Sequence, residues 1–245
     1  MNSQIKNNLS VIRNRILTAC KTSNRNPSEV KLLLATKTVP AEKILIALQQ
    51  GETLIGENKV QELKEKHDAL ASIPHKAHYI GHLQTNKIKE VLNYVDCIQS
   101  VDRMDLVEKL DQRLRQEGRT LEILLQVNTS YEESKFGIDP SEVMEFAKAV
   151  SKYDTLKVKG LMTIGLFSSD LEKVRVCFRL LKNIRTQLEE LQLPNFDLNE
   201  LSMGMSNDLE VAIEEGATIV RVGTAIFGDR IYPDSYYWNE KIDVK

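Results

Sequence analysis

Cysteine is scarce in this chain, and its few copies are scattered. The three cysteines are Cys20, Cys97 and Cys177. Their odd number and wide spacing match neither a disulfide framework nor a zinc-ligand pattern. The histidines His75, His78 and His82 likewise have no acidic or thiol partner at a metal-ligand spacing. We therefore expect no metal site.

The chain also lacks an excess of one charge and any long hydrophobic run. Lys and Arg number 33 against 35 for Asp and Glu, which gives a formal net charge of −2. A nucleic-acid surface usually requires a basic domain or stripe, so we expect no nucleic-acid partner. The N-terminal residues are interrupted by Asn, Lys and Arg, unlike a secretory signal, and no apolar run approaches membrane-span length. These absences predict a soluble, cytoplasmic protein without membrane contact.

Glycine-rich nucleotide-binding patterns and internal linkers are missing as well. No Gly-x-Gly-x-x-Gly follows the first apolar segment, which disfavours a dinucleotide-binding open sheet. No Gly/Pro/Ser-rich tract, low-complexity segment or internal repeat divides the chain. With 245 residues, of which 42% are hydrophobic, the chain is long enough for one large barrel or two small domains.

What is present is a regular alternation of short apolar segments and helical patterns. Ile5, Leu9, Ile12 and Ile16 recur at spacings of three and four and predict an amphipathic N-terminal helix. Asp139 is expected to cap the helix after the fifth strand. Strands are expected at about 30–35, 53–55, 78–82, 97–101, 121–128, 158–163, 198–203 and 217–222.

Eight such units in one unbroken chain predict a single (β/α)8 TIM barrel over residues 1–245, of class α/β, with an extra N-terminal helix. A doubly wound open sheet is the structural alternative. In both folds ligands bind at the carboxyl ends of the strands, where Lys37 directly follows the first strand. An ammonium partly withdrawn from water is neutral more often, and the neutral amine can form a Schiff base with an aldehyde.

The loops after the seventh and eighth strands have the composition of a phosphate site. Gly204 and Ser206 follow the seventh strand, and Gly223 and Thr224 follow the eighth. Such loops bind phosphate through backbone N–H groups and a helix N-terminus in many barrels. Ser206 or Asn207 is expected to cap the next helix, whereas Asp208 and Glu210 in its first turn would repel a dianion. A lysine and a phosphate cradle at one mouth of the barrel predict that the ligand is a phosphorylated aldehyde. The best candidate is pyridoxal 5′-phosphate (PLP).

Six sequence motifs in this order resemble the PLP homeostasis protein family over nearly the whole chain. The motifs are Ala35-Thr36-Lys37, Gly56-Glu57-Asn58-Lys59-Val60-Gln61-Glu62, His78-Tyr79-Ile80-Gly81-His82-Leu83-Gln84-Thr85-Asn86-Lys87, Gly160-Leu161-Met162-Thr163-Ile164, Leu201-Ser202-Met203-Gly204-Met205-Ser206 and Arg221-Val222-Gly223-Thr224-Ala225-Ile226-Phe227-Gly228. One departure is Ala77, where the family often has tryptophan. The resemblance implies a barrel similar to the N-terminal domain of alanine racemase.

The resemblance also implies a set of cofactor-binding residues. Lys37 would carry PLP as a Schiff base, and Arg221 would approach the pyridine nitrogen. For His82, the residues alone leave open a proton shuttle or a structural histidine. The complete set expected at the cofactor is Lys37, Asn58, His82, Met203, Ser206, Arg221, Gly223 and Thr224, with Ser206, Gly223 and Thr224 at the phosphate.

The function implied is PLP binding in vitamin B6 homeostasis, without robust catalysis of its own. Alanine-racemase-like enzymes take a second base from a further domain, and the aromatic residues Tyr232, Tyr236, Tyr237 and Trp238 are expected instead to pack against the barrel. We expect a monomer that supplies PLP-dependent apoenzymes. The alternatives are a weak PLP-dependent amino-acid racemase and a Schiff-base aldolase or phosphosugar isomerase on the same barrel.

Overall fold

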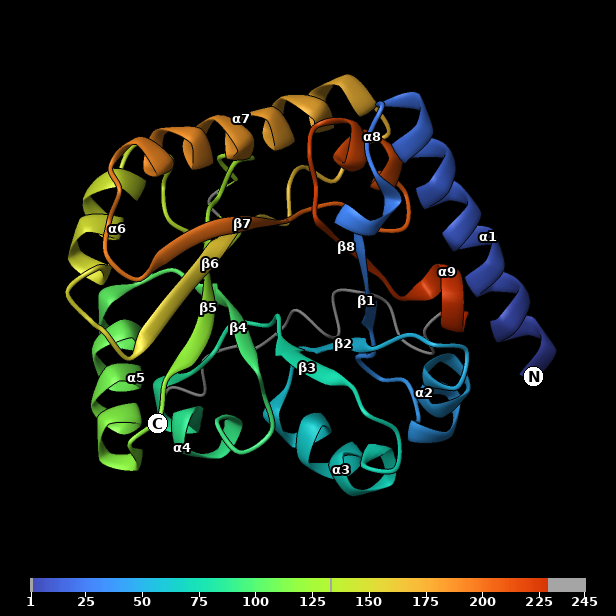
Figure 1. Cartoon of the computed structure of the whole chain (residues 1–245), viewed down its shortest axis with the longest axis horizontal. Coiled ribbons are helices and arrows are strands. Elements are labelled where there is room, and N and C mark those ends of the chain that lie inside the picture. The colour runs from blue at the N-terminus through green and yellow to red at the C-terminus, as the bar shows by residue number, and fades with distance from the viewer. Residues whose placement is uncertain (1, 133, 229–245) are drawn as a thin grey trace.

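A computed structural model describes residues 2–132 and 134–228, and these residues form a closed barrel of eight parallel strands surrounded by helices (Figure 1). The strands are β1 Lys31–Ala35, β2 Leu54–Glu57, β3 Lys76–Tyr79, β4 Cys97–Val101, β5 Leu121–Gln126, β6 Leu156–Met162, β7 Phe196–Ser202 and β8 Ile219–Val222. The α-helices are α1 Asn2–Thr22, α2 Ala41–Leu48, α3 Val60–Leu70, α4 Ile88–Val91, α5 Met104–Glu117, α6 Val143–Val150, α7 Leu171–Glu190, α8 Leu209–Glu214 and α9 Thr224–Phe227.

The strands follow one another around the barrel in sequence order, and the barrel closes where β8 pairs with β1. Leu34 lies opposite Val222 in this pairing. Residues 35 and 223 are therefore neighbours at the carboxyl ends of the two strands. The (β/α)8 barrel predicted from the sequence is confirmed, whereas the single domain over residues 1–245 stays a prediction.

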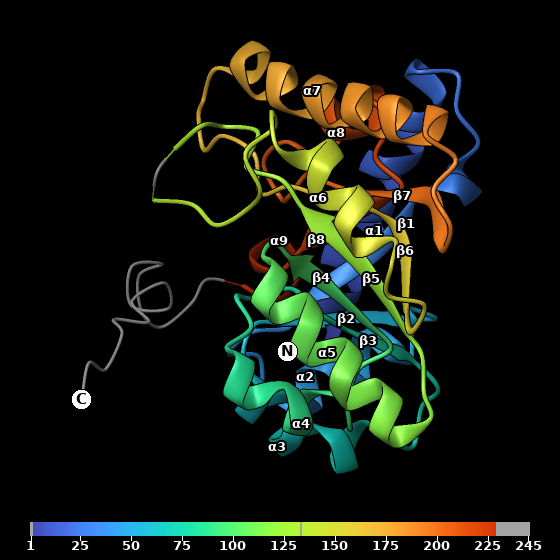
Figure 2. The ribbon, with the colours of Figure 1, turned by 90° about the vertical axis from the view of Figure 1, so that its left-hand side faces the viewer.

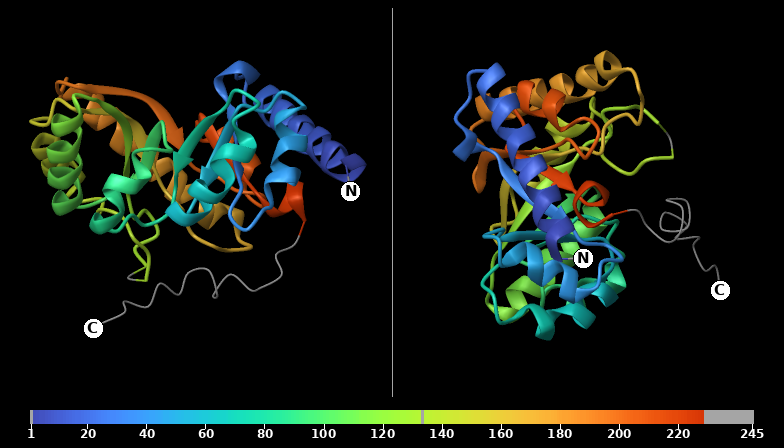
Figure 3. Two further views of the ribbon diagram at one scale, coloured as in Figure 1. Left: turned by 90° about the horizontal axis from the view of Figure 1, so that it is seen from below. Right: turned by 90° about the vertical axis from the view of Figure 1, so that its right-hand side faces the viewer.

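The helices form an outer layer around the strands. Helices α5 and α6 lie in front of the barrel strands in the side view of Figure 2. The additional helix α1 runs along the outside of the barrel, where it contacts α2, α8 and α9 (Figure 3). Its residues Ile5, Leu9, Ile12 and Ile16 are buried, as the spacing predicted. None of the helices in the described part of the chain is long and apolar enough to cross a membrane.

Alternation along each strand separates an outer core from the barrel interior. Leu32 and Leu34 of β1 belong to the large hydrophobic cluster that includes the buried faces of the helices, whereas Leu33 packs with Leu54 and Ile219 in a small separate cluster. This period of two is what a strand buried on both faces requires. Side chains with the same parity as Leu33 and Ile219 therefore reach the inside of the barrel.

Three local features differ from the sequence-based expectations. Strand β3 ends at Tyr79 rather than at His82, because the chain turns at Gly81, where a Cβ atom would lie 2.3 Å from the carbonyl oxygen of Asn58. Helix α6 begins at Val143, since the Asp139 side chain accepts the Ser141 N–H in a preceding turn instead of capping the helix. The four-residue helix α9 was not predicted. Residues Tyr232, Tyr236, Tyr237 and Trp238 lie outside the described residues.

Candidate functional site

Lys37 lies in a tight turn between β1 and α2. The Val39 N–H donates to the Thr36 carbonyl oxygen at 2.9 Å, so Lys37 and Thr38 are the central residues of the turn. Thr38 has a φ of 63°, a left-handed conformation that is unfavourable for a β-branched residue. Non-glycine residues in this region are found at sites where the surrounding structure holds them. The turn is therefore strained at Thr38, directly after Lys37.

Beneath this turn lies a group of charged side chains, Glu57, Glu62 and Lys66, which we call the inner charge cluster. The Lys66 ammonium donates to Glu57 Oε1 at 2.6 Å and to Glu62 Oε2 at 2.7 Å. The Thr36 hydroxyl also lies 2.7 Å from Glu57 Oε1. The Glu57 side chain is only 1% exposed, and the Lys66 side chain is 11% exposed. The cluster joins β2 and α3 directly to the residue before Lys37.

Glu57 has the most perturbed carboxyl group of the cluster. Burial raises the pKa of Glu57 to about 7, and the nearby Glu62 acts in the same direction, while the Lys66 ammonium and the hydrogen bonds from Lys66 and Thr36 oppose the rise. The second carboxylate oxygen, Oε2, is buried without a hydrogen-bond partner. A buried carboxyl in this state takes up a proton more readily than an exposed one, so the charge of the cluster changes near neutral pH.

Across the β1–β8 junction, Gly223 packs tightly against the strand that leads to Lys37. A Cβ atom on Gly223 would lie 2.9 Å from the Ala35 carbonyl oxygen and 3.3 Å from the Ala35 Cβ. A side chain would therefore push the two strands apart. Gly223 is the N-cap of α9, which begins at Thr224. The structure thus brings the expected phosphate residues Gly223 and Thr224 next to the strand end of Lys37.

Arg221 lies inside the barrel at the end of a directional chain of hydrogen bonds. Its guanidinium donates to the Ser202 hydroxyl at 2.8 Å and to the Thr163 carbonyl at 2.7 Å. The Ser202 hydroxyl donates to Gln99 Oε1 at 2.6 Å, and Gln99 Nε2 lies 2.7 Å from His78 Nδ1. Burial lowers the pKa of His78 to about 3, so its imidazole is neutral and accepts this hydrogen bond. This series of hydrogen bonds fixes the orientation of the Arg221 guanidinium.

The guanidinium of Arg221 keeps its charge despite this burial. Desolvation lowers its pKa to about 10, and the Asp208 carboxylate acts in the opposite direction. The group is therefore cationic at neutral pH. Its hydrogen-bond partners on Ser202 and Thr163 are a hydroxyl and a carbonyl, which are both neutral. The barrel interior thus holds a positive charge that is solvated by dipoles.

The loop after β7 is built around Gly204 and Asp208. A Cβ on Gly204, whose φ is 90°, would lie 2.4 Å from the Ala212 Cβ, so the loop can approach α8 only through glycine. The expectation that Ser206 or Asn207 caps α8 is wrong, because Asp208 is at the N-cap position and its side chain accepts the Met205 N–H.

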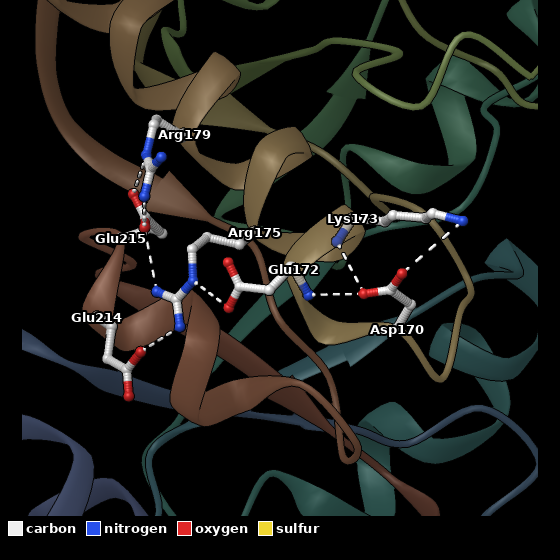
Figure 4. A network of polar contacts seen from close by, with 7 residues as sticks. All are labelled: Asp170, Glu172, Lys173, Arg175, Arg179, Glu214 and Glu215. Carbon is white, nitrogen blue, oxygen red and sulfur yellow. Dashed lines mark hydrogen bonds and ion pairs between the residues drawn. The ribbon is translucent and has the colours of Figure 1, made fainter.

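Helix α8 is held in place from two sides. Arg15 of α1 forms two hydrogen bonds to Glu210, at 2.6 and 2.8 Å, which neutralise one of the two charges expected to repel a dianion. On the other side, Arg175 and Arg179 of α7 bond the carboxylates at the end of α8 (Figure 4). We call the residues of this second group the outer charge cluster: Asp170, Glu172, Lys173, Arg175, Arg179, Glu214 and Glu215.

The remaining predicted residues lie in two different places. Asn58 and His82 follow β2 and β3 at the same mouth as Lys37, and the His82 ring stacks on Phe136 with 3.9 Å between ring centroids. Met203, in contrast, is fully buried in the large outer hydrophobic cluster. Within residues 2–132 and 134–228, no group of three or more His, Cys, Asp or Glu side chains is arranged to hold a metal ion.

Sequence reasoning missed the polar residues that support the site from below. Glu62 and Lys66 are four residues apart, which resembles an ordinary surface pair on a helix. Gln99 and Ser202 were hidden within predicted strands, although a polar residue in a strand buried on both faces is a signal that it has a specific partner.

Comparison with known proteins defines the class of barrel first. A family model described as "Alanine racemase, N-terminal domain" matches residues 3–231. The alanine racemase of Clostridium difficile superposes with a TM-score of 0.75 at 13% identity, covering 95% of this chain and 58% of that enzyme, a likeness of fold alone. The chain is therefore a barrel of the alanine racemase N-terminal class, as the sequence predicted.

Two nearer relatives identify the family. The pyridoxal phosphate homeostasis protein of Haemophilus influenzae is 41% identical over 233 residues, which cover 94% of this chain and 98% of that protein. PipY of Synechococcus elongatus, solved with PLP bound, has a TM-score of 0.80 at 33% identity and covers 92% of this chain and 100% of PipY. The chain belongs to the pyridoxal phosphate homeostasis protein family.

Proposed function

We propose that this chain binds PLP as a Schiff base on Lys37 and takes part in PLP homeostasis without robust catalytic turnover. The observation that carries the proposal is the junction of β1 and β8, where the strand leading to Lys37 packs against Gly223 and the start of α9. An amine and a phosphate cradle at adjacent strand ends fit a phosphorylated aldehyde. The PLP bound in the PipY structure supports the same assignment.

The residues at the mouth fit the three parts of the cofactor. Lys37 would bind the aldehyde carbon, Arg221 would face the pyridine nitrogen, and the phosphate would be held by Ser206, Gly223 and Thr224. In α9 the Ile226 and Phe227 N–H groups donate to the Gly223 carbonyl oxygen, so the Thr224 and Ala225 N–H groups would be the ones to meet a phosphate. Asn58 and His82 would flank the ring. Because the Met203 side chain is buried in the core, we expect any contact from Met203 to come from its backbone.

The charge inside the barrel supports the proposed absence of robust catalysis. PLP supplies an aldehyde that condenses with an amine, releasing water, and a ring that stabilises carbanions best when its nitrogen is protonated. Arg221 remains cationic and donates hydrogen bonds, so it disfavours a proton on a facing nitrogen. Lys37 would then hold the cofactor while Arg221 keeps its ring a poor electron sink.

The proposal extends to the setting in which the chain works. We infer that it acts in the cytoplasm as a monomer and that PLP-dependent apoenzymes receive its cofactor. The name of the Haemophilus influenzae relative, which refers to PLP homeostasis rather than to a reaction, supports a role in supply.

The test begins with the absorbance spectrum of the full chain before and after addition of PLP. We expect a visible Schiff-base band that borohydride fixes, and peptide mapping of the reduced protein should locate the label on Lys37. Lys37→Ala should lose that labelled peptide, whereas the exposed Lys21→Ala should keep it. No band in the wild type, with PLP free in solution, would reject the cofactor assignment.

A turnover assay separates the carrier from a racemase. The holoprotein is incubated with several L-amino acids, and the appearance of D-enantiomers is followed over time. We expect no accumulation above that produced by free PLP. Turnover that disappears in Lys37→Ala would instead favour the amino-acid racemase.

A further inference from the structure

The peptide groups on both sides of Lys37 are bonded to the same helix. The Lys66 ammonium donates to the Thr36 carbonyl oxygen at 2.9 Å, and Glu62 Oε2 accepts the Thr38 N–H at 2.6 Å. Glu62 and Lys66 are one turn apart on α3 and bond each other at 2.7 Å. Helix α3 therefore holds the turn at the residue before Lys37 and at the residue after it.

These contacts account for the strained backbone of the turn. Thr38 is left-handed although it is β-branched, and such a conformation persists only where other interactions hold it. The N–H that Glu62 accepts belongs to Thr38 itself. Without this acceptor, the turn can relax, and the direction in which the Lys37 side chain leaves the backbone changes with it.

The anchor itself is set deep in the fold. Lys66 also bonds Glu57 at 2.6 Å, and the Thr36 hydroxyl lies 2.7 Å from the same carboxylate oxygen. The Glu62 side chain is 18% exposed and lies at the outer end of the cluster. The structure therefore connects the carboxyl end of β2 to the Lys37 turn through Lys66, with Glu62 as the more exposed residue of the cluster.

We propose that Glu62 and Lys66 are positioning residues for Lys37, which aim its amine at the cofactor aldehyde by holding the Thr36 carbonyl and the Thr38 N–H. The inference rests on the proposed function. Correct orientation of the amine favours condensation with the aldehyde but contributes nothing to binding of the ring or the phosphate. The two contributions can therefore be separated with a ligand that lacks the aldehyde.

The experiment compares the affinity of the full chain for PLP and for pyridoxine 5′-phosphate, which carries an alcohol in place of the aldehyde. In Glu62→Met, which removes the acceptor for the Thr38 N–H, we expect the affinity for PLP to fall about tenfold to a hundredfold, the range for losing a hydrogen bond that involves a charged group. The affinity for pyridoxine 5′-phosphate should be unchanged. Glu62→Gln keeps an acceptor oxygen of the same reach and should restore most of the PLP affinity.

Two further variants separate positioning from general destabilisation. Glu117→Met removes a carboxylate of similar exposure, 21%, that accepts from Arg113 on α5, far from the Lys37 turn. It should leave both affinities unchanged. Glu62→Asp keeps the charge but shortens the reach, and it should weaken PLP binding selectively even if Glu62→Met fails to fold.

The outcomes distinguish the positioning role from the proposed function. A wild-type chain that binds neither ligand would reject the proposed function. A wild-type chain that binds both, with Glu62 variants that lose both affinities equally or lose neither, would overturn the positioning role while leaving the cofactor assignment intact. A loss of affinity for PLP alone in Glu62→Met, with recovery in Glu62→Gln, supports the positioning role.

Discussion

The inner and outer charge clusters both tie a helix to its neighbours, but in opposite surroundings. In the inner cluster, one lysine bonds two carboxylates, and Glu57 is almost completely buried. In the outer cluster, Arg175 bonds Glu172, Glu214 and Glu215, and its own side chain is 20% exposed. The carboxylate at the centre of the inner cluster is thus removed from water, whereas the outer cluster extends from the buried Glu215 to the exposed Glu172.

The difference explains why only one of the two clusters is suited to a functional role. Charges taken out of water depend on their partners, so a buried cluster has one arrangement and holds the backbone bonded to it. Exposed ion pairs are screened and contribute little to stability. The inner cluster bonds the backbone on both sides of Lys37. The outer cluster holds α8 against α7 through side chains, and its backbone bonds, from the Glu172 and Lys173 N–H groups to Asp170, only cap the start of α7.

The largest expected effect is the loss of stability in Lys66→Met. The substitution leaves the buried Glu57 without its counter-ion, so the free energy of unfolding should fall by about 3–5 kcal/mol at a pH well above 7, where Glu57 is ionised in the wild type, and by less at lower pH, where the carboxyl takes up a proton. Urea unfolding measures the change. In a Glu57→Gln background the same substitution should cost clearly less, and equal losses in both backgrounds would show that Glu57 and Lys66 are not coupled.

The second effect is a pH dependence that originates from Glu57. Because its pKa in the folded protein is about 7 rather than the ordinary 4.5, the folded state binds this proton more tightly than the unfolded state. The resulting stability is fully present below pH 4.5 and is lost as pH rises through about 7. The difference between the two pKa values corresponds to about 3 kcal/mol.

Glu57→Gln isolates this term because all other titrating groups are common to both proteins. Its stability relative to the wild type should rise as the pH increases from below 4.5 to above 7. Thermal unfolding across this range measures the difference. A constant difference at every pH would mean that the Glu57 carboxyl titrates as it does in the unfolded chain.

A third, smaller effect concerns the strain above the inner cluster. Thr38→Gly removes the penalty of a left-handed β-branched residue, which is about 1 kcal/mol, partly offset by the greater freedom of glycine in the unfolded chain. We expect a net gain in the free energy of unfolding. The matched control is Thr186→Gly on the exposed side of α7, which should lower stability because its backbone is helical. A loss of stability in Thr38→Gly would show that the left-handed conformation of Thr38 does not destabilise the folded protein.

Much of the barrel could be predicted because the spacing of apolar residues, which indicates strands and buried helix faces, is a local property of the sequence. Strand β4 was predicted with its observed bounds, 97–101, and the four apolar residues of α1 were placed on its buried face. The early end of β3 was not predictable, because it depends on contact between Gly81 and Asn58, which are distant in sequence. The apolar pattern alone continued the strand past this turn.

The candidate site was predicted only where motifs carried the signal. Lys37 and Gly223 stand one or two residues after the ends of apolar strands, so their meeting at one mouth follows from the fold class. The inner cluster depends instead on how α3 packs over β2, which brings Lys66 to Glu57 and to the Thr36 carbonyl. In the sequence alone, Lys66 pairs equally well with Glu62 as a solvated helix residue.

The smaller loss of stability is expected in the outer cluster and completes the comparison. Arg175→Met should lower the free energy of unfolding by about 1 kcal/mol, because its pairs with Glu172 and Glu214 are open to solvent and its buried partner Glu215 keeps Arg179 as a counter-ion. The loss should shrink further at high salt, since screening already weakens these pairs in the wild type. The loss in Lys66→Met should persist at the same salt concentration, because its partner Glu57 is withdrawn from the ions. Urea unfolding at low and high salt measures both variants, and equal salt dependence would remove the distinction between the two clusters.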